Sequence, residues 1–177
     1  MRAKLLGAVL AAALAAGAAF ASQPDPDLAQ RVAHAIRMYP YYTIWDDISF
    51  RVANGQVELT GAVNQPYKKS DIERLVQKVP GVASVNDQIK VLPLSPMDDQ
   101  LRLRVARAIY SYPALSRYGM GALPSIHVIV ENGHVTLAGV VDSQSDKDLA
   151  GIRASGAGLS FGSVVNQLHV VNPAARS

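Results

Sequence analysis

The chain contains no cysteine. It therefore cannot form a disulfide framework, a thiolate zinc site, a thiol nucleophile or a lipid anchor on an N-terminal cysteine. An excess of one charge is also missing, because 17 Lys and Arg stand against 14 Asp and Glu. A nearly neutral protein has no overall field that attracts phosphates, and any such attraction needs a local patch. We therefore expect no nucleic-acid partner.

Short motifs of the common enzyme classes are absent as well. The chain has no Gly-x-Ser-x-Gly, no phosphate loop and no dinucleotide fingerprint. Asp46-Asp47 and Asp98-Asp99 are better explained as the starts of a strand and a helix than as acid and base pairs. His127 and His134 lie in one predicted hairpin, several ladder steps apart, which is too far for a shared metal. We interpret both as solvent-facing and expect no catalytic residues, no metal site and no cofactor.

The one long apolar run lies at the N-terminus. Arg2 and Lys4 precede an apolar stretch over residues 5–20, and Ala19-Phe20-Ala21 is a small-x-small cleavage pattern. This arrangement is typical of a secretory signal peptide, and the stretch is shorter than the roughly 20 residues of a spanning helix. We expect residues 1–21 to be removed. This removal lowers the number of basic residues from 17 to 15. We expect the exported protein to be periplasmic or extracellular.

The rest of the chain is an internal duplication. Three segments recur in the same order, and they pair 28–40 with 101–113, 48–61 with 126–139, and 85–91 with 164–170. The offsets of 73, 78 and 79 residues place five additional residues in the second copy, between its first helix and first strand. We expect two domains, at 25–91 and 99–172, joined by the proline-containing linker 92–98.

Each copy predicts the order helix, strand, strand, helix, strand. The first helices have one apolar face, and Pro40 and Pro113 end them. Asn54-Gly55 and Asn132-Gly133 predict two-residue hairpin turns between the first two strands. A helical crossover favours a parallel third strand. We therefore predict an α+β fold with two tandem αββαβ domains, each a three-stranded mixed sheet with two helices packed on one face.

The other face of each sheet is expected to stay solvated. In the first copy the hairpin sets Arg51 opposite Glu58, and both would lie on this face. In the second copy His127, Glu131 and His134 have the same polar character.

The repeated pattern combines an amphipathic helix with Ile-x-[Phe/Val]-x-Val-x-Asn-Gly-x-Val-x-Leu-x-Gly-x-Val, and the first copy adds Gly81-Val82-Ala83-Ser84-Val85. It resembles the BON domain over nearly the whole mature chain. The resemblance implies an exported, non-enzymatic protein, similar to osmotically inducible periplasmic proteins with two BON domains. Domains of this family associate with phospholipid membranes or envelope proteins. Two departures are the missing lipidated cysteine and the segment Ser160-Phe161-Gly162-Ser163-Val164, which replaces the glycine-valine pattern in the second copy.

The first helix of the second copy carries the candidate binding surface. Its apolar spacing assigns Leu101, Val105, Ala108, Ile109 and Tyr112 to the core. The residues that then project outward are Leu103, Arg104, Arg107 and Tyr110. Arginine binds phosphate through a planar fork, and Tyr and Leu suit the membrane interface, so an anionic phospholipid surface is the expected partner. The same face would also suit plain solvent exposure or contact with the first copy.

The five additional residues fall in an unusually apolar segment, 114–124. It adds Arg117, Tyr118 and Met120 to the candidate surface. The first copy has Tyr41, Tyr42, Ile44 and Trp45 at the equivalent place. Apolar loops either cover the core of a small domain or present a partner site, and we expect covering, with the contact between copies as a further use.

Three functions are compatible with these patterns. The leading hypothesis is binding to phospholipid membrane surfaces or envelope components, in envelope maintenance or osmotic stress. The alternative is a periplasmic chaperone-like or scaffolding module that binds proteins. A ligand pocket between the two copies is a third interpretation. No pattern specifies an oligomeric state.

Overall fold

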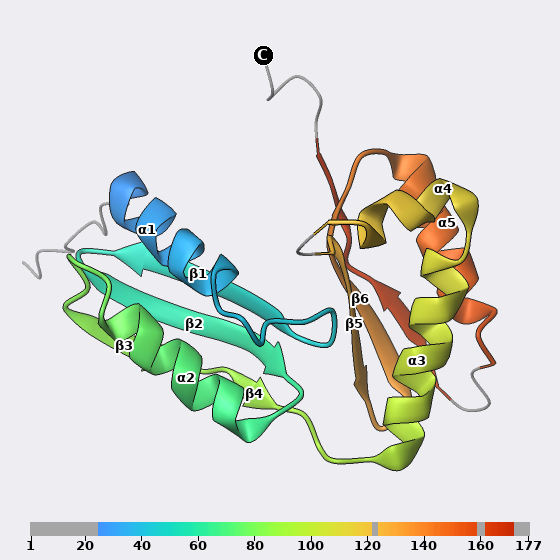
Figure 1. Cartoon of the computed structure of the whole chain (residues 1–177), viewed down its shortest axis with the longest axis horizontal. Helices are drawn as coiled ribbons and strands as arrows, with labels where there is room; N and C mark the ends of the chain where they lie inside the picture. Colours follow the sequence, from blue (N-terminus) through green and yellow to red (C-terminus); the bar gives the residue numbers. More distant parts are fainter. Residues whose placement is uncertain (1–24, 122–123, 159–161, 172–177) are drawn as a thin grey trace, which may run out of the picture.

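The computed structural model describes residues 25–121, 124–158 and 162–171 (Figure 1). The predicted signal peptide, residues 1–21, lies outside these ranges. So do Leu123 of the apolar segment and Ser160-Phe161 of the departure from the family pattern.

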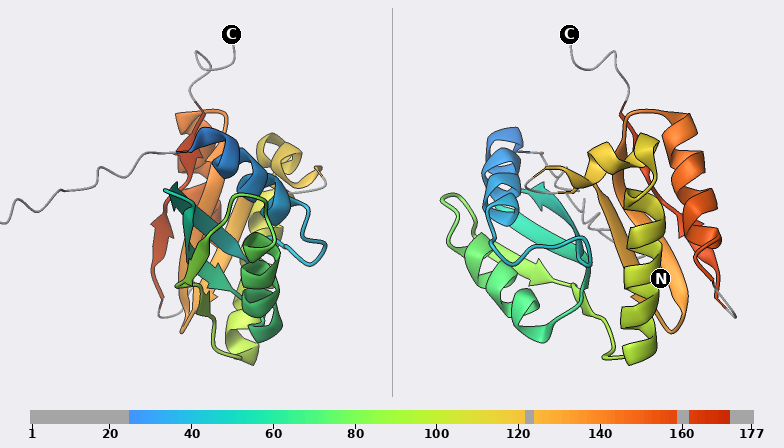
Figure 2. Two further views of the ribbon diagram at one scale, coloured as in Figure 1. Left: turned by 90° about the vertical axis from the view of Figure 1, so that its left-hand side faces the viewer. Right: turned by 45° about the vertical axis from the view of Figure 1, so that its right-hand side comes forward.

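The predicted α+β fold with two αββαβ units is confirmed. The first copy consists of α1 (Pro26–Arg37), β1 (Asp47–Ala53), β2 (Gln56–Val63), α2 (Pro66–Gln77), β3 (Ser84–Asp87) and β4 (Lys90–Val91). The second consists of α3 (Pro96–Tyr110), α4 (Pro113–Ser116), the 3-10 helix η1 (Arg117–Gly119), β5 (Ile126–Glu131), β6 (His134–Val141), α5 (Gln144–Ser155), β7 (Val164–Asn166) and β8 (His169–Val170). Helices α1 and α2 lie on one outer side of the molecule, and α3 and α5 on the other (Figure 2).

Each sheet is mixed, as predicted. Strand β2 pairs antiparallel with β1 and parallel with both β3 and β4, and β6 does the same with β5, β7 and β8. The predicted third strand is thus broken into two short pieces. In the first copy the break falls at Gln88 and Ile89, where Ile89 turns into the core and its N–H donates to the Asp87 side chain.

The Asn-Gly hairpin turns are confirmed. Asn54 has a φ of 52° and Asn132 a φ of 51°, and the glycine that follows each also has a positive φ, as a type I′ turn requires. The turn fixes the register, so Arg51 lies opposite Glu58 and their side chains approach to 3.8 Å.

The linker is shorter than predicted. Helix α3 begins at Pro96, within the range expected to be extended, and Ser95 caps it by accepting from the Asp98 N–H at 3.2 Å. A proline is compatible with the first turn of a helix because no N–H is needed there. Leu92 is buried and its N–H donates to Val63, so it still packs with the first copy.

The two copies have separate cores. The first cluster of buried apolar residues lies entirely between Leu28 and Ile89, and the second between Leu101 and Leu168. Because the first core is closed by its own helices and strands, we expect a fragment ending at Leu94 to remain folded. Circular dichroism should show native-like helix content and cooperative melting, and a disordered fragment would contradict this expectation.

A loop of the first copy, residues 41–46, contacts the second copy, and we call it the junction loop. The Val128 N–H donates to the Ile44 carbonyl at 2.7 Å, and Trp45 packs against the second core. Lys90 and Glu131 add an ion pair at 2.6 Å between the copies.

The junction also corrects the solvent-facing assignment of His127. This side chain is only 9% exposed, and its ring centroid lies 5.5 Å from that of Tyr42. The outer face of the second sheet is therefore covered by the first copy at this point. His134, near the hairpin turn, is exposed as predicted.

Candidate functional site

The outward side of α3 is the most exposed apolar and cationic surface on this helix. It carries Met97, Gln100, Leu103, Arg104 and Arg107, which we call the α3 face. At 3.6 residues per turn these five positions fall within about 120° of the helix circumference. Met97 is 80% exposed and Leu103 is 56% exposed, and Leu94 just before the helix is also exposed. The outward positions predicted for Leu103, Arg104 and Arg107 are confirmed.

The two arginines of this face differ from the third arginine of the helix. Arg102 is buried, donates to the Val130 carbonyl at 2.6 Å and pairs with Asp99. The side chains of Arg104 and Arg107 have no hydrogen-bond or ion-pair partner within the part of the chain that the structure describes. Their charges are therefore available to an external anion.

Tyr110 does not belong to this face, contrary to the prediction. It packs against the second core, and its hydroxyl donates to the Ile126 carbonyl at the free edge of β5. Burial raises the pKa of Tyr110 above its usual value. Tyr112, which was assigned to the core, is instead 37% exposed and lies under the Arg153 guanidinium. The Ile126 carbonyl at the edge of the sheet, rather than the spacing along the helix, therefore decides which tyrosine packs against the core.

Tyr118 and Arg117 are structural as well. The Tyr118 hydroxyl is buried, donates to Asp146 at 2.9 Å and accepts from the Asp142 N–H. Arg117 binds Asp146 at 2.7 Å. The hydrogen bond from Ser143, followed by those from Tyr118 and Arg117, lowers the pKa of Asp146 against the opposing effect of burial.

The apolar segment therefore covers the second core, as expected. Leu115 of this segment is fully buried, whereas Met120 remains 79% exposed. Met120 lines a hollow of about 410 Å³ at the junction, together with Ile44, Tyr110, Ser116, Gly119 and Pro124. The hollow lies where a ligand pocket between the two copies would lie. The Tyr110 hydroxyl that borders it already donates to the Ile126 carbonyl.

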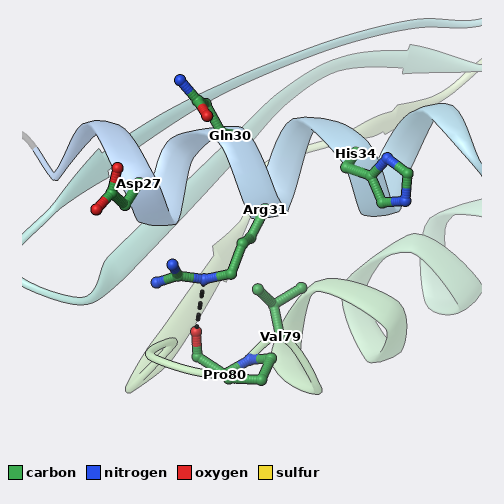
Figure 3. A pocket seen from close by; sticks show the side chains of 6 residues that line it. All are labelled: Asp27, Gln30, Arg31, His34, Val79 and Pro80. Carbon is green, nitrogen blue, oxygen red and sulfur yellow. Dashed lines mark hydrogen bonds between the residues drawn. The ribbon is translucent and has the colours of Figure 1, made fainter.

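The first copy has a counterpart of the α3 face that the sequence reasoning missed. The offset of 73 residues aligns Arg31 and His34 with Arg104 and Arg107. In the structure these side chains border an open hollow of about 480 Å³, which is lined by Asp27, Gln30, Arg31, His34, Val79 and Pro80 (Figure 3). Arg31 donates to the Pro80 carbonyl at 3.2 Å and shares the hollow with Asp27, so its charge is partly engaged.

A second missed feature is a buried ion pair in the first copy. Lys68 and Asp46 are 3% and 0% exposed and approach to 2.6 Å. The Thr43 hydroxyl donates to Asp46 at 2.7 Å, and the Asn64 N–H donates to its other oxygen at 3.1 Å. Asp47 begins β1 as predicted, but Asp46 is part of this internal network rather than a strand-start signal.

Asp98 also has a role beyond the start of a helix. Its buried carboxylate accepts from the N–H groups of Asn132 and Gly133 at 2.9 and 2.8 Å. Together with Arg102 it attaches α3 to the β5–β6 hairpin, so the orientation of the α3 face is fixed. In the described ranges no cluster of three or more His, Asp or Glu could hold a metal ion, and no helix is long and apolar enough to cross a membrane.

Comparison with solved structures finds weak likenesses. CdsD, a structural protein of the type III secretion system of Chlamydia trachomatis, is 17% identical over 85% of this chain and 96% of that chain, with a TM-score of 0.29. A structure of the CdsD C-terminal domain is 16% identical over 84% and 99% of the two chains, with a TM-score of 0.30. Scores this low support no argument about this chain.

Comparison with curated proteins finds no match. The family model of the BON domain, in contrast, matches residues 24–93 and again residues 98–172. The two matches span the two αββαβ units and cover most of the sequence. The chain therefore belongs to the BON domain family, with two copies of the domain in tandem.

Proposed function

We propose that the chain is an exported, non-enzymatic envelope protein that binds anionic phospholipid surfaces through the α3 face. The observation that carries the proposal is the pair Arg104 and Arg107, whose side chains have no partner among the described residues and are flanked by exposed Leu103 and Met97. A basic residue near an anionic surface contributes about 1 kcal/mol. Two such residues give weak, reversible binding, which the apolar side chains strengthen by entering the interface.

The rigid mounting of α3 supports this proposal. Asp98 and Arg102 hold the helix against the hairpin, and Tyr110 holds its last turn against β5. The outward side chains therefore meet a surface without ordering the backbone first, which lowers the entropic cost of binding. The counterpart on α1 is the weaker site, because Arg31 is already hydrogen bonded and Asp27 would repel an anion.

Replacing Arg104 and Arg107 with glutamate should abolish binding to anionic liposomes in a pelleting assay. Thermal stability should stay within about 0.5 kcal/mol of wild type, because both positions are exposed. Added salt should also weaken wild-type binding, since screening limits electrostatic reach to about 8 Å at physiological ionic strength.

Arg74→Glu combined with Lys78→Glu provides the matched control. It reverses two exposed charges in the other copy, Arg74 in the last turn of α2 and Lys78 just after the helix, so the net charge changes equally while the α3 face stays intact. This control should retain most of the binding. If wild type does not pellet with anionic liposomes at low salt, the lipid proposal fails. The exposed apolar residues Leu94, Met97 and Met120 then favour the second candidate, a protein-binding scaffold.

A further inference from the structure

The two copies differ in how the free edge of their first strand is filled. In an antiparallel pair, alternate residues direct their N–H and C=O groups away from the partner strand. In β5 these are Ile126, Val128 and Val130, and one outward backbone group of each has a partner. Tyr110 donates to the Ile126 carbonyl, Val128 donates to Ile44 at 2.7 Å, and Arg102 donates to the Val130 carbonyl.

The equivalent edge of β1 is largely open. An offset of 78 residues aligns Ile48, Phe50 and Val52 with the three edge residues of β5. The Ile48 N–H donates to the Tyr42 hydroxyl at 3.3 Å. The outward backbone groups of Phe50 and Val52 have no hydrogen-bond partner among the residues of the described ranges. The position of Arg102 is taken by Ala29, which has no side-chain donor.

Side-chain burial shows the same difference independently. The three edge residues of β5 are fully buried, whereas Ile48 and Phe50 in β1 are only half-buried. Part of the cover in the second copy comes from Trp45 of the junction loop, which packs on the second core. In the first copy the edge strand therefore has both open backbone groups and partly exposed apolar side chains.

We propose that the β1 edge binds an extended segment of a partner protein by strand addition, with a bulky apolar side chain covering Phe50. The junction loop shows one contact that such an edge accepts, which it makes from a turn closed by the Asp46 N–H and the Thr43 carbonyl rather than from a strand. Its Ile44 carbonyl takes the N–H of the residue equivalent to Phe50, and the adjacent Trp45 supplies the apolar cover. In strand addition, backbone hydrogen bonds give affinity and alternate side chains give specificity. The β1 edge shares no residue with the α3 face.

A peptide with the sequence of residues 41–47, Tyr-Tyr-Thr-Ile-Trp-Asp-Asp, is a suitable probe. Titrated into the ¹⁵N-labelled mature chain, it should shift the amide signals of Phe50 and Val52 and slow their hydrogen exchange. A peptide with alanine in place of Ile and Trp should bind at least about tenfold more weakly, because it offers no apolar cover. Shifts confined to Val128 and its neighbours would mean that the probe only displaces the junction loop, and would overturn the proposal. Absence of any shift would do the same.

Phe50→Pro tests the backbone contact. The Phe50 N–H points away from β2, so proline removes it without breaking the β1–β2 ladder. Binding should fall about tenfold or more, while Phe50→Leu, which keeps the N–H, should stay within a few-fold of wild type. If Phe50→Pro does not fold, amide exchange on the wild-type chain decides alone. Concentration-dependent shifts at Phe50 without peptide, together with a dimer in ultracentrifugation, would assign the edge to a second copy and overturn the partner-segment proposal.

Discussion

Replacing Lys68 with methionine should destabilise the protein by about 3–5 kcal/mol, because Asp46 would then be a buried charge without a counterion. Asp46 is fully buried, and its remaining contacts, with Thr43 and the Asn64 N–H, are hydrogen bonds from neutral groups. Neutral donors do not replace the full charge that Lys68 provides at 2.6 Å. The junction loop that carries Asp46 should loosen at the same time, since this pair attaches it to α2.

Urea denaturation measures the effect directly, and two variants serve as references. Arg74→Met removes an exposed ion pair with Asp71 on the same helix and should cost at most about 1 kcal/mol. The combination of Lys68→Met with Asp46→Asn should recover much of the lost stability, because the amide oxygen still accepts from Asn64 and no charge is left buried. A loss below about 1 kcal/mol for Lys68→Met alone would show that the pair is solvated, contrary to the structure.

Alanine at Gly61 or Gly139 should cost about 3–4 kcal/mol or prevent folding. The two glycines are equivalent, with φ values of 109° and 105°. A Cβ on Gly61 would lie 2.0 Å from the Asp47 carbonyl oxygen, and on Gly139 2.1 Å from that of Ser125. Each of these carbonyl groups belongs to the backbone at the start of the neighbouring strand. It can move only if the hydrogen bonds at the open end of the hairpin, far from the turn, break.

Gly156→Ala is the matched control for these substitutions. Gly156 has an ordinary φ of −74°, and a Cβ there would meet nothing closer than 3.5 Å. Its stability should change by about 0.5 kcal/mol or less. Thermal melting separates the cases. If Gly61→Ala or Gly139→Ala melts within about 4 °C of wild type, a change near 1 kcal/mol, the close backbone approach is wrong.

Hairpins were predictable because their signal is local. Asn-Gly favours positive φ at two consecutive residues, and this alone sets the register that places Arg51 opposite Glu58. The burial of Lys68 also had a local signal, which the sequence reasoning passed over. Lys68 stands four and eight residues before Ile72 and Val76, on the buried stripe of α2.

Other features depend on contacts between segments far apart in the sequence, which leave no local signal. His127 has the polarity of a solvated strand position but is buried, with Tyr42 of the first copy lying against its ring. Tyr110 and Tyr112 are both compatible with the flank of an amphipathic helix. The free carbonyl of Ile126 selects Tyr110, and that carbonyl is located only once β5 is placed beside α3. Of the candidate residues on the helix, Leu103, Arg104 and Arg107 are exposed as predicted, because their outward position follows from helical spacing alone.

The ion pairs that join the segment after the first helix to the second helix have opposite polarity in the two copies. In the first copy the acid, Asp46, belongs to the segment after the first helix, and the base, Lys68, belongs to the second helix. In the second copy Arg117 is on that segment, and Asp146, which aligns with Lys68, is on the helix. A duplicated chain is prone to misfolding in which a segment of one copy docks on the other. Such a swap would set Asp46 against Asp146 and Arg117 against Lys68. Two like-charge contacts would then oppose the exchanged structure, so each segment is directed back to its own domain.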